Sequence, residues 1–373
     1  MDQRRFYVRP LLALGGEDPE KKRASHGMFA KLCARDDLLF SHVEILERHA
    51  PKQTAVHLLD LEELKDFSSR EMKVSPEAFQ DFQKLIANLT SQRADFAGLS
   101  MERPRLMGIV NITPDSFSDG GSFSSPQEAI TQALRLAESG ADILDLGAES
   151  TRPGARAISV EEELKRLMPV LEGLRPRTTA KISIDTRKSE VMLRAAEAGA
   201  DLWNDVSALT FDPRSLEVAA EKKWPLLLMH AQGLPETMNE KPVYENVALD
   251  VFDYLEGRID ACLRAGIESA RLVLDPGIGF GKHLPHNVAL LSSLSLYHGL
   301  GVPVLLGVSR KKLIGQLSKE EHPKERVSGS LAAALAAIAQ GVQILRVHDV
   351  AETLQAVRVW QAILRGAEEP CAL

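Results

Sequence analysis

The chain has 373 residues, and its hydrophobic fraction of 44% and charged fraction of 26% are typical of a globular protein. A net charge of −7 argues against non-specific binding to nucleic acid or to an anionic membrane surface. The three cysteines are scattered and form no CxxC pair, which argues against a disulfide scaffold or a thiolate zinc site and favours a cytoplasmic protein. The apolar stretch near the start is too short for a signal peptide or a membrane span.

Residues 1–103 contain predicted secondary structure but no motif that indicates chemistry. Apolar runs predict short strands over residues 6–14 and 43–46. Ser75 and Pro76 begin a predicted helix whose apolar stripe, typical of a packing face, consists of Phe79, Phe82, Leu85, Ile86 and Leu89. We therefore predict an N-terminal α+β extension of unknown role over residues 1–103, followed by a catalytic domain over residues 104–373.

From Arg105 onward, apolar runs alternate with helical patterns, and several helices end at a glycine just before the next run. The predicted strands are residues 106–110, 143–146, 182–184, 202–203, 226–229, 272–274, 304–306 and 344–347. Eight strand–helix units over about 260 residues are typical of a (β/α)8 TIM barrel, an α/β fold. A doubly wound sheet is the alternative, but eight units would make an unusually long open sheet.

Nearly every predicted strand ends in polar or charged residues. These are Asn111, residues 149–152, Asp185, Asn204, His230, Asp275, residues 309–312 and residues 346–349. Each one alone has a structural explanation, such as a helix cap or a surface ion pair. Chemistry in a barrel takes place at the carboxyl ends of the strands. In a barrel these polar residues would all lie on the rim formed by the carboxyl ends of the strands, and we therefore predict an active site at that rim.

Asp185, Asn204 and Asp275 supply carboxylate and amide groups at three of these strand ends. Such groups suit a flat heterocycle that is rich in N–H donors and is held by paired hydrogen bonds. Lys311 adds a donor for a ring oxygen. The glycines of the 275–282 loop suggest the close approach of a ligand.

Arg152, Arg346 and His348 form a predicted cationic cluster that suits phosphates. Arg346 and His348 share one face of a strand, and no carboxylate obviously pairs with both, so we expect them to recruit an anion. Asn111 offers a neutral oxygen that would complete a hydrated Mg²⁺ bridging phosphates. The predicted helix after Ser309 also favours an anion at its start. Because no HExxH motif or Ser-His-Asp arrangement is apparent, the set favours transfer from a pyrophosphorylated heterocycle over hydrolysis.

At these residues the chain resembles the dihydropteroate synthase family. The segments NITPDSFSDGG, GAESTRPG, SIDTRK, NDVS, DPGIGFGK, GVSRKKLIG and RVHDV occur in the family's order, and the resemblance covers about residues 104–365. It implies condensation of 6-hydroxymethyl-7,8-dihydropterin pyrophosphate with p-aminobenzoate, giving 7,8-dihydropteroate and pyrophosphate in folate synthesis. It also implies Mg²⁺ as cofactor and a homodimer.

The resemblance assigns a role to individual residues. The pterin would contact Asp185, Asn204, Val206, Met229, Asp275 and Lys311. The pyrophosphate would contact Asn111, Arg152, Arg346 and His348, with Mg²⁺ on Asn111. The p-aminobenzoate would contact Phe117, Thr151, Pro153, Phe280 and Lys312. The implied catalytic residues are Asp185, Lys311 and Asp119, the last of them on a loop that closes over the site.

Two departures from the family pattern are Ala148, where a second glycine is usual, and Ala231, where methionine is common. Neither position has an assigned role. The methyltetrahydrofolate:corrinoid methyltransferase barrels are the nearest alternative, but they have no use for a pyrophosphate cluster. A catalytically silent pterin-binding protein is the other alternative. The presence of Asn111, Arg152, Lys311, Arg346 and His348 argues against it.

Overall fold

The computed structural model describes residues 4–13, 28–50, 53–67, 74–112, 125–152, 154–235, 237–238 and 240–365. Three residues with predicted roles, Phe117, Asp119 and Pro153, lie outside these ranges. Among the described residues, no helix is both long enough and apolar enough to cross a membrane.

The predicted barrel strands are all present. They are β5 (Arg105–Asn111), β6 (Ile143–Gly147), β7 (Lys181–Asp185), β8 (Leu202–Asp205), β9 (Leu226–Met229), β10 (Leu272–Asp275), β11 (Leu305–Leu306) and β12 (Ile344–Val347). Within the described ranges they form one parallel sheet in the order β10-β9-β8-β7-β6-β5-β12-β11. A parallel bridge between Leu274 and Val304 joins its two ends, and the Leu274 N–H donates to Pro303 O at 3.0 Å. The fold is therefore the predicted (β/α)8 barrel.

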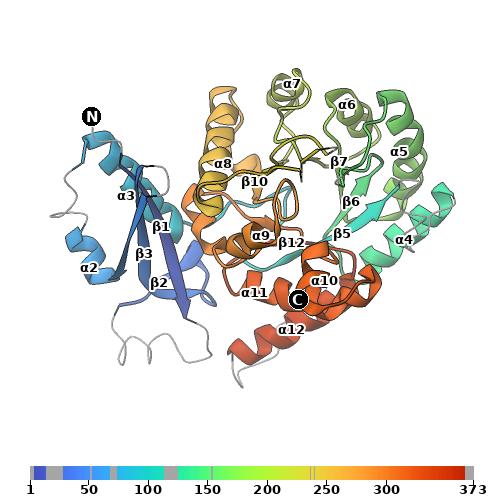
Figure 1. Ribbon diagram of the computed structural model, residues 1–373. Coiled ribbons are helices and arrows are strands. Elements are labelled where there is room, and N and C mark those ends of the chain that lie inside the picture. Colours follow the sequence, from blue (N-terminus) through green and yellow to red (C-terminus); the bar gives the residue numbers. More distant parts are fainter. Residues whose placement is uncertain are drawn as a thin grey trace.

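Helices between the strands cover the outside of the barrel (Figure 1). They are α4 (Pro126–Glu138), α5 (Val160–Leu174), α6 (Ser189–Glu197), α7 (Ser215–Lys222), α8 (Val247–Arg264), α9 (Leu284–Leu291), α10 (Lys312–Ser318), α11 (Val327–Ile338) and α12 (Val350–Arg365). Ser125 and Ser159 cap α4 and α5, and their hydroxyl groups accept the N–H groups of Glu128 and Glu162 at 3.4 and 3.2 Å. Each cap satisfies a helix donor that has no partner inside its helix.

The barrel interior is apolar at the amino ends of the strands, which we call its lower end. Side chains there form a separate hydrophobic cluster of Met107, Ile143, Leu202, Leu227, Val273, Leu305 and Ile344. Phe96 and Met101, from the segment that precedes β5, are buried in the same cluster and fill the floor of the barrel. The polar residues at the carboxyl ends of the strands lie above this apolar layer.

The part of residues 1–103 that the structure describes also contains the two predicted strands and the predicted helix. Its strands are β1 (Arg5–Ala13), β2 (Ala30–Lys31), β3 (Leu39–Ala50) and β4 (Gln53–Asp60), and its helices are α2 (Leu61–Asp66) and α3 (Pro76–Thr90). β3 pairs antiparallel with the other three strands. We call β1 to α3 the N-terminal module.

The N-terminal module packs on the barrel beside α8, as Figure 1 shows. β1 and α3 contact the 3-10 helix η6 (Leu294–Leu300). Three residues of the predicted α3 stripe, Phe82, Leu85 and Leu89, are buried, whereas Phe79 is exposed. The three buried residues belong to one hydrophobic cluster that continues into the barrel core. The apolar stripe is therefore the packing face that the sequence predicts, and it packs against the barrel.

Candidate active site

Four residues lie side by side across the upper ends of β5 to β8. The strand register pairs Asn111 with Gly147, Gly147 with Asp185, and Asp185 with Asn204. A Cβ atom on Gly147 would lie 3.7 Å from both Asn111 Oδ1 and Asp185 Oδ2. Glycine therefore leaves open the space between the predicted pyrophosphate residue and the predicted pterin residue. We call Asn111, Gly147, Asp185 and Asn204 the acceptor row.

Arg346 projects into the barrel beneath this row and binds two carboxylates. Its Nε donates to Asp145 Oδ2 at 2.6 Å, and its Nη2 donates to Asp185 Oδ2 at 2.9 Å. Asn204 Nδ2 also donates to Asp145 Oδ2, at 3.2 Å. The sequence analysis found no carboxylate that pairs with both Arg346 and His348, and it missed Asp145, which lies one layer below the rim on β6 and neutralises part of the charge of Arg346.

These contacts set the ionisation of the site. Burial raises the pKa of Asp185 to about 7, even though the charge of Arg346 acts to lower it. Burial acts to lower the pKa of Arg346, but Asp145 and Asp185 raise it above its ordinary value, so Arg346 stays charged. Asp185 Oδ1 is buried and has no hydrogen-bond partner among the described residues. An unpaired buried acceptor is costly, which makes this atom a natural position for a ligand donor.

Asp275 and Lys311 lie on the other side of the rim. The Gly277 N–H donates to Asp275 Oδ1 at 2.7 Å. Lys311 Nζ donates to the Ile278 carbonyl and lies 4.7 Å from the centre of the Phe280 ring. Burial lowers the pKa of Lys311 to about 8, while Asp275 acts to raise it. Burial also raises the pKa of Asp275, and Lys311 opposes that shift.

The glycines of the β10–α9 loop have a structural cause. A Cβ on Gly277 would lie 1.9 Å from the His230 carbonyl oxygen, and one on Gly281 would lie 2.3 Å from the Gln232 carbonyl oxygen. Both residues also have positive φ. The close approach inferred from the sequence is therefore to the protein's own backbone after β9. The nearby Lys282 Nζ is buried and bonds to His230 Nδ1 at 2.8 Å.

His348 is held by Ser309, whose Oγ lies 3.1 Å from His348 Nδ1 and accepts the His348 N–H at 3.2 Å. Burial, together with the charges of Arg310, Arg346, Arg152 and Lys311, lowers the pKa of His348 to about 3. The prediction of a cationic histidine is therefore wrong for the unliganded protein, in which His348 is neutral at pH 7. It remains suited to donate or accept a hydrogen bond.

A pocket of about 290 Å³ opens beside this rim. Thr151, Val206 and Phe280, all predicted ligand contacts, line it. The sequence analysis did not identify the other lining residues, Arg187, Ser207, Thr210, Phe211, Ala231, Gly233, Leu234, Pro235, Met238 and Tyr254. Met229 is buried nearby, and a Cβ on Gly277 would lie 3.2 Å from its Cγ. Lys312 is exposed at the start of α10.

A buried ion network fixes the start of the β6–α5 loop, which carries Thr151 and Arg152. Glu149 accepts from Arg187 Nη2 at 3.0 Å and from Lys188 Nζ at 2.9 Å. Lys188 also donates to Glu163 Oε2 at 2.6 Å. Two carboxylates and two cations balance each other, so the network carries no uncompensated buried charge. The sequence indicates Glu149 only as part of a motif, since its partners come from later in the chain.

Asn111 is the residue predicted to hold Mg²⁺. Within the described ranges, no group of three His, Cys, Asp or Glu side chains could hold a metal ion. Mg²⁺ commonly binds through one or two protein oxygens and completes its shell with water and substrate phosphates. A single oxygen from Asn111 beside a bound pyrophosphate fits this way of binding Mg²⁺, in which water and phosphate oxygens supply the remaining ligands.

Comparison with known proteins identifies the class of enzyme first. A model of the pterin binding enzyme family matches residues 107–348, the span from β5 to the residue just after β12. This span contains the acceptor row, Asp275, Lys311 and Arg346. Barrel and site together therefore define a pterin-binding enzyme.

Comparison with individual relatives narrows this class to one enzyme family. The chain is 48% identical to the dihydropteroate synthase of Escherichia coli strain K12 over 275 residues, which cover 74% of this chain and 97% of that protein. A structure of the Xanthomonas albilineans dihydropteroate synthase with 4-aminobenzoic acid is 51% identical, with a TM-score of 0.68, and the match covers 73% of this chain and 97% of that one. Another, in complex with 7,8-dihydropteroate, is 45% identical with a TM-score of 0.64, and the match covers 73% and 98%. The chain belongs to the dihydropteroate synthase family.

Proposed function

We propose that the protein condenses 6-hydroxymethyl-7,8-dihydropterin pyrophosphate with p-aminobenzoate, giving 7,8-dihydropteroate and pyrophosphate. The observation that carries this proposal is the acceptor row, in which the buried Asp185 Oδ1 has no partner among the described residues. A pterin N–H would supply that partner, and a charge-assisted bond of this kind is among the stronger hydrogen bonds in proteins.

The pterin would lie across Asp185, Asn204 and Asp275, with Lys311 as donor to its ring oxygen. Val206 and Met229, both buried, would cover its apolar surface. Since the ionised carboxylate of Asp185 accepts N–H donors more strongly than the neutral acid, the bound pterin would lower the pKa that burial raises in the free protein.

The pyrophosphate would lie at the Asn111 end of the row. We propose Arg152 as its principal charged ligand, and His348 as a neutral one whose Nε2 points to a phosphate oxygen while Nδ1 lies beside Ser309. Arg346 remains a proposed pyrophosphate ligand, with its charge already shared with Asp145 and Asp185. Mg²⁺, when bound through Asn111, would offset negative charge on the departing pyrophosphate.

The p-aminobenzoate would enter the pocket of about 290 Å³ and contact Thr151 and Phe280. Phe117, Pro153 and Lys312 are the remaining proposed contacts. The arylamine is neutral at pH 7, so its attack needs no strong general base. We propose an SN1-like reaction in which pyrophosphate leaves first and positive charge develops on the pterin methylene. The carboxylates of Asp185 and Asp275 would stabilise that charge. Asp119 stays a proposed catalytic residue, on the loop proposed to close over the site.

A reaction with both substrates and Mg²⁺, followed by mass spectrometry, tests this function directly. We expect 7,8-dihydropteroate and pyrophosphate in equal amounts, and no dihydropteroate when p-aminobenzoate is omitted. Pterin binding without any product would favour the silent pterin-binding protein. Methyl transfer from methyltetrahydrofolate to a corrinoid would favour the methyltransferase. Either result would contradict the proposal.

We further propose that the protein is a cytoplasmic homodimer. α11 packs on α12 within the chain and leaves Ala332 and Ala336 exposed, one turn apart. Small side chains at this spacing allow a second chain to approach closely.

A further inference from the structure

The segment between β9 and α8, residues 230–246, forms one wall of the pocket. Ala231, Gly233, Leu234, Pro235 and Met238 all line the pocket. The Gly154 N–H donates to the Pro235 carbonyl at 2.8 Å, so this segment also supports the loop that carries Thr151 and Arg152. We call residues 230–246 the β9–α8 loop. Its position determines the shape of the pocket.

The two halves of the β9–α8 loop are tied together. Gln232 Nε2 donates to the Val243 carbonyl at 3.0 Å, and the Val243 N–H donates back to Gln232 Oε1 at 2.9 Å. Tyr244 Oη donates to the Gly281 carbonyl at 2.8 Å, next to Phe280, which also lines the pocket. A shift at the end of the loop would therefore reach both the lining residues of the loop and the segment that carries Phe280.

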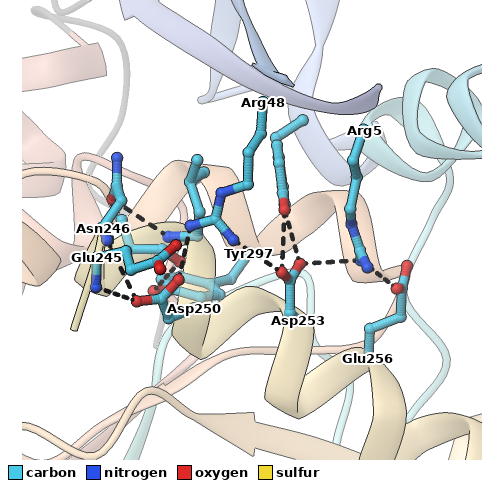
Figure 2. Close-up of polar contacts among 11 residues, drawn as sticks. Arg5, Arg48, Glu245, Asn246, Asp250, Asp253, Glu256 and Tyr297 are labelled. Carbon is cyan, nitrogen blue, oxygen red and sulfur yellow. Dashed lines mark hydrogen bonds and ion pairs between the residues drawn. The ribbon is translucent and has the colours of Figure 1, made fainter. Parts of the chain in front are cut away.

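Asp250, in the first turn of α8, holds that end. Its Oδ2 accepts the N–H groups of Glu245 at 2.8 Å and Asn246 at 3.2 Å. Its Oδ1 accepts from Arg48 Nη2 at 2.6 Å, and Arg48 comes from β3 of the N-terminal module. Figure 2 shows Arg48 reaching Asp250, with Glu245 and Asn246 on the other side of the carboxylate. One carboxylate thus joins the N-terminal module to the loop.

Arg48 is itself held in place. Its Nη1 donates to Asp253 Oδ2 at 3.2 Å, and its guanidinium lies 5.8 Å from the centre of the Tyr7 ring. The Arg48 and Asp250 side chains are only 17% and 25% exposed, so water screens this pair less than a surface pair. A charged hydrogen bond in such a setting fixes the carboxylate that the loop amides bind.

We propose that Arg48 and Asp250 are positioning residues, through which the N-terminal module holds the β9–α8 loop and sets the affinity for the arylamine substrate. The identification of the pocket's ligand as the arylamine substrate rests on the proposed function. The coupling between the module and the loop does not rest on it, since the coupling follows from the contacts alone.

Arg5 provides a matched control. It lies on the same face of the N-terminal module and binds Asp253 at 3.0 Å and also Glu256, further along α8 (Figure 2). Neither carboxylate accepts an N–H group of the β9–α8 loop in any contact that the described residues make. We therefore expect Arg5→Gln to weaken the contact between module and barrel, as Arg48→Gln does. It leaves in place the bond from Arg48 to Asp250 and the bonds from Asp250 to the loop N–H groups.

The kinetic test compares full-length Arg48→Gln and Arg5→Gln. We expect Arg48→Gln to raise KM for p-aminobenzoate about threefold to tenfold, with kcat within about twofold of wild type. This is less than the full effect of losing a charge-assisted hydrogen bond to the substrate, because Arg48 acts on the substrate only through the loop. Arg5→Gln should leave this KM within about twofold of wild type, and Arg48→Lys should recover part of the loss because it keeps the charge.

Amide hydrogen exchange at Val243, Glu245 and Asn246 provides a second measurement that needs no activity. We expect these amides to exchange about fivefold faster in Arg48→Gln, which corresponds to the stability that one ordinary hydrogen bond contributes. We expect no change in their exchange in Arg5→Gln. Equal KM values and equal exchange in the two variants would overturn the proposal, because Arg48 would then only dock the module. If the wild type makes no dihydropteroate, the proposed function fails while the exchange result still decides the coupling.

Discussion

Arg346 lies between two buried carboxylates, and this position changes what its removal should do. In Arg346→Ala, Asp145 and Asp185 would face each other without a cation, so the pKa of Asp185 would rise further. We expect weaker binding of pyrophosphate and also weaker binding of the pterin, each by about tenfold or more, since removing one partner of a buried pair leaves the other uncompensated. Arg152→Ala should weaken only pyrophosphate binding, because the two ion pairs of Arg346 with Asp145 and Asp185 remain in that variant.

Calorimetric titration of both variants with pyrophosphate and with 6-hydroxymethyl-7,8-dihydropterin separates the two effects. A loss confined to pyrophosphate in Arg346→Ala would show that Asp185 does not depend on Arg346. The assignment expected from the sequence, in which Arg346 binds only the pyrophosphate and does not affect the pterin, would then hold.

The ionisation of Asp185 and Lys311 predicts how pterin affinity varies with pH. Asp185 binds N–H donors most strongly as a carboxylate, and burial raises its pKa to about 7, so affinity should increase as pH rises through about 7. Lys311 donates best when protonated, and burial lowers its pKa to about 8, so affinity should decrease above about 8. Titration with 6-hydroxymethyl-7,8-dihydropterin, which has no phosphate to ionise, measures this directly. Lys311→Arg should keep the acidic limb and lose the alkaline one, whereas a flat wild-type profile would contradict the assignment.

At the scale of elements, the eight strands were predictable because each is an apolar run that ends at polar or turn residues. The strand register then brings Asn111, Asp185 and Asn204 into one row, although 93 residues separate the first from the last in the sequence. Strand ends were enough to predict that these residues share one rim, whereas the regular parallel pairing that places them in a row is seen only in the structure. The structure does not describe Phe117, Asp119 and Pro153, so their assignments remain predictions.

Asp145 was missed because it stands inside the apolar run of β6. A run of four residues does not reveal which side chains face the barrel interior, and a single carboxylate among leucines gives no signal of its own. The alternation along β6 places Asp145 on the same side as Gly147, beneath the acceptor row. Pocket residues such as Phe211 and Tyr254 were missed for a related reason: no strand-end pattern marks their positions.

At the scale of the whole molecule, barrel and N-terminal module share one continuous hydrophobic cluster. The division at residue 103 remains a prediction. Phe96 and Met101, on the N-terminal side of that boundary, fill the floor of the barrel. The amphipathic stripe of α3 was enough to predict that the module packs on something. It was not enough to predict Arg48 and Asp250, since 202 residues separate them in the chain.

The central claim is that the acceptor row is the pterin site, and one titration of the full-length protein tests it. Asp185→Ala removes at least one charge-assisted hydrogen bond to the heterocycle, worth roughly 1.5–3 kcal/mol, so the Kd for 6-hydroxymethyl-7,8-dihydropterin should rise about tenfold or more. Lys312→Ala, on the proposed arylamine side of the site, should leave that Kd unchanged. An unchanged Kd in Asp185→Ala, with the protein folded, would mean that the pterin binds elsewhere.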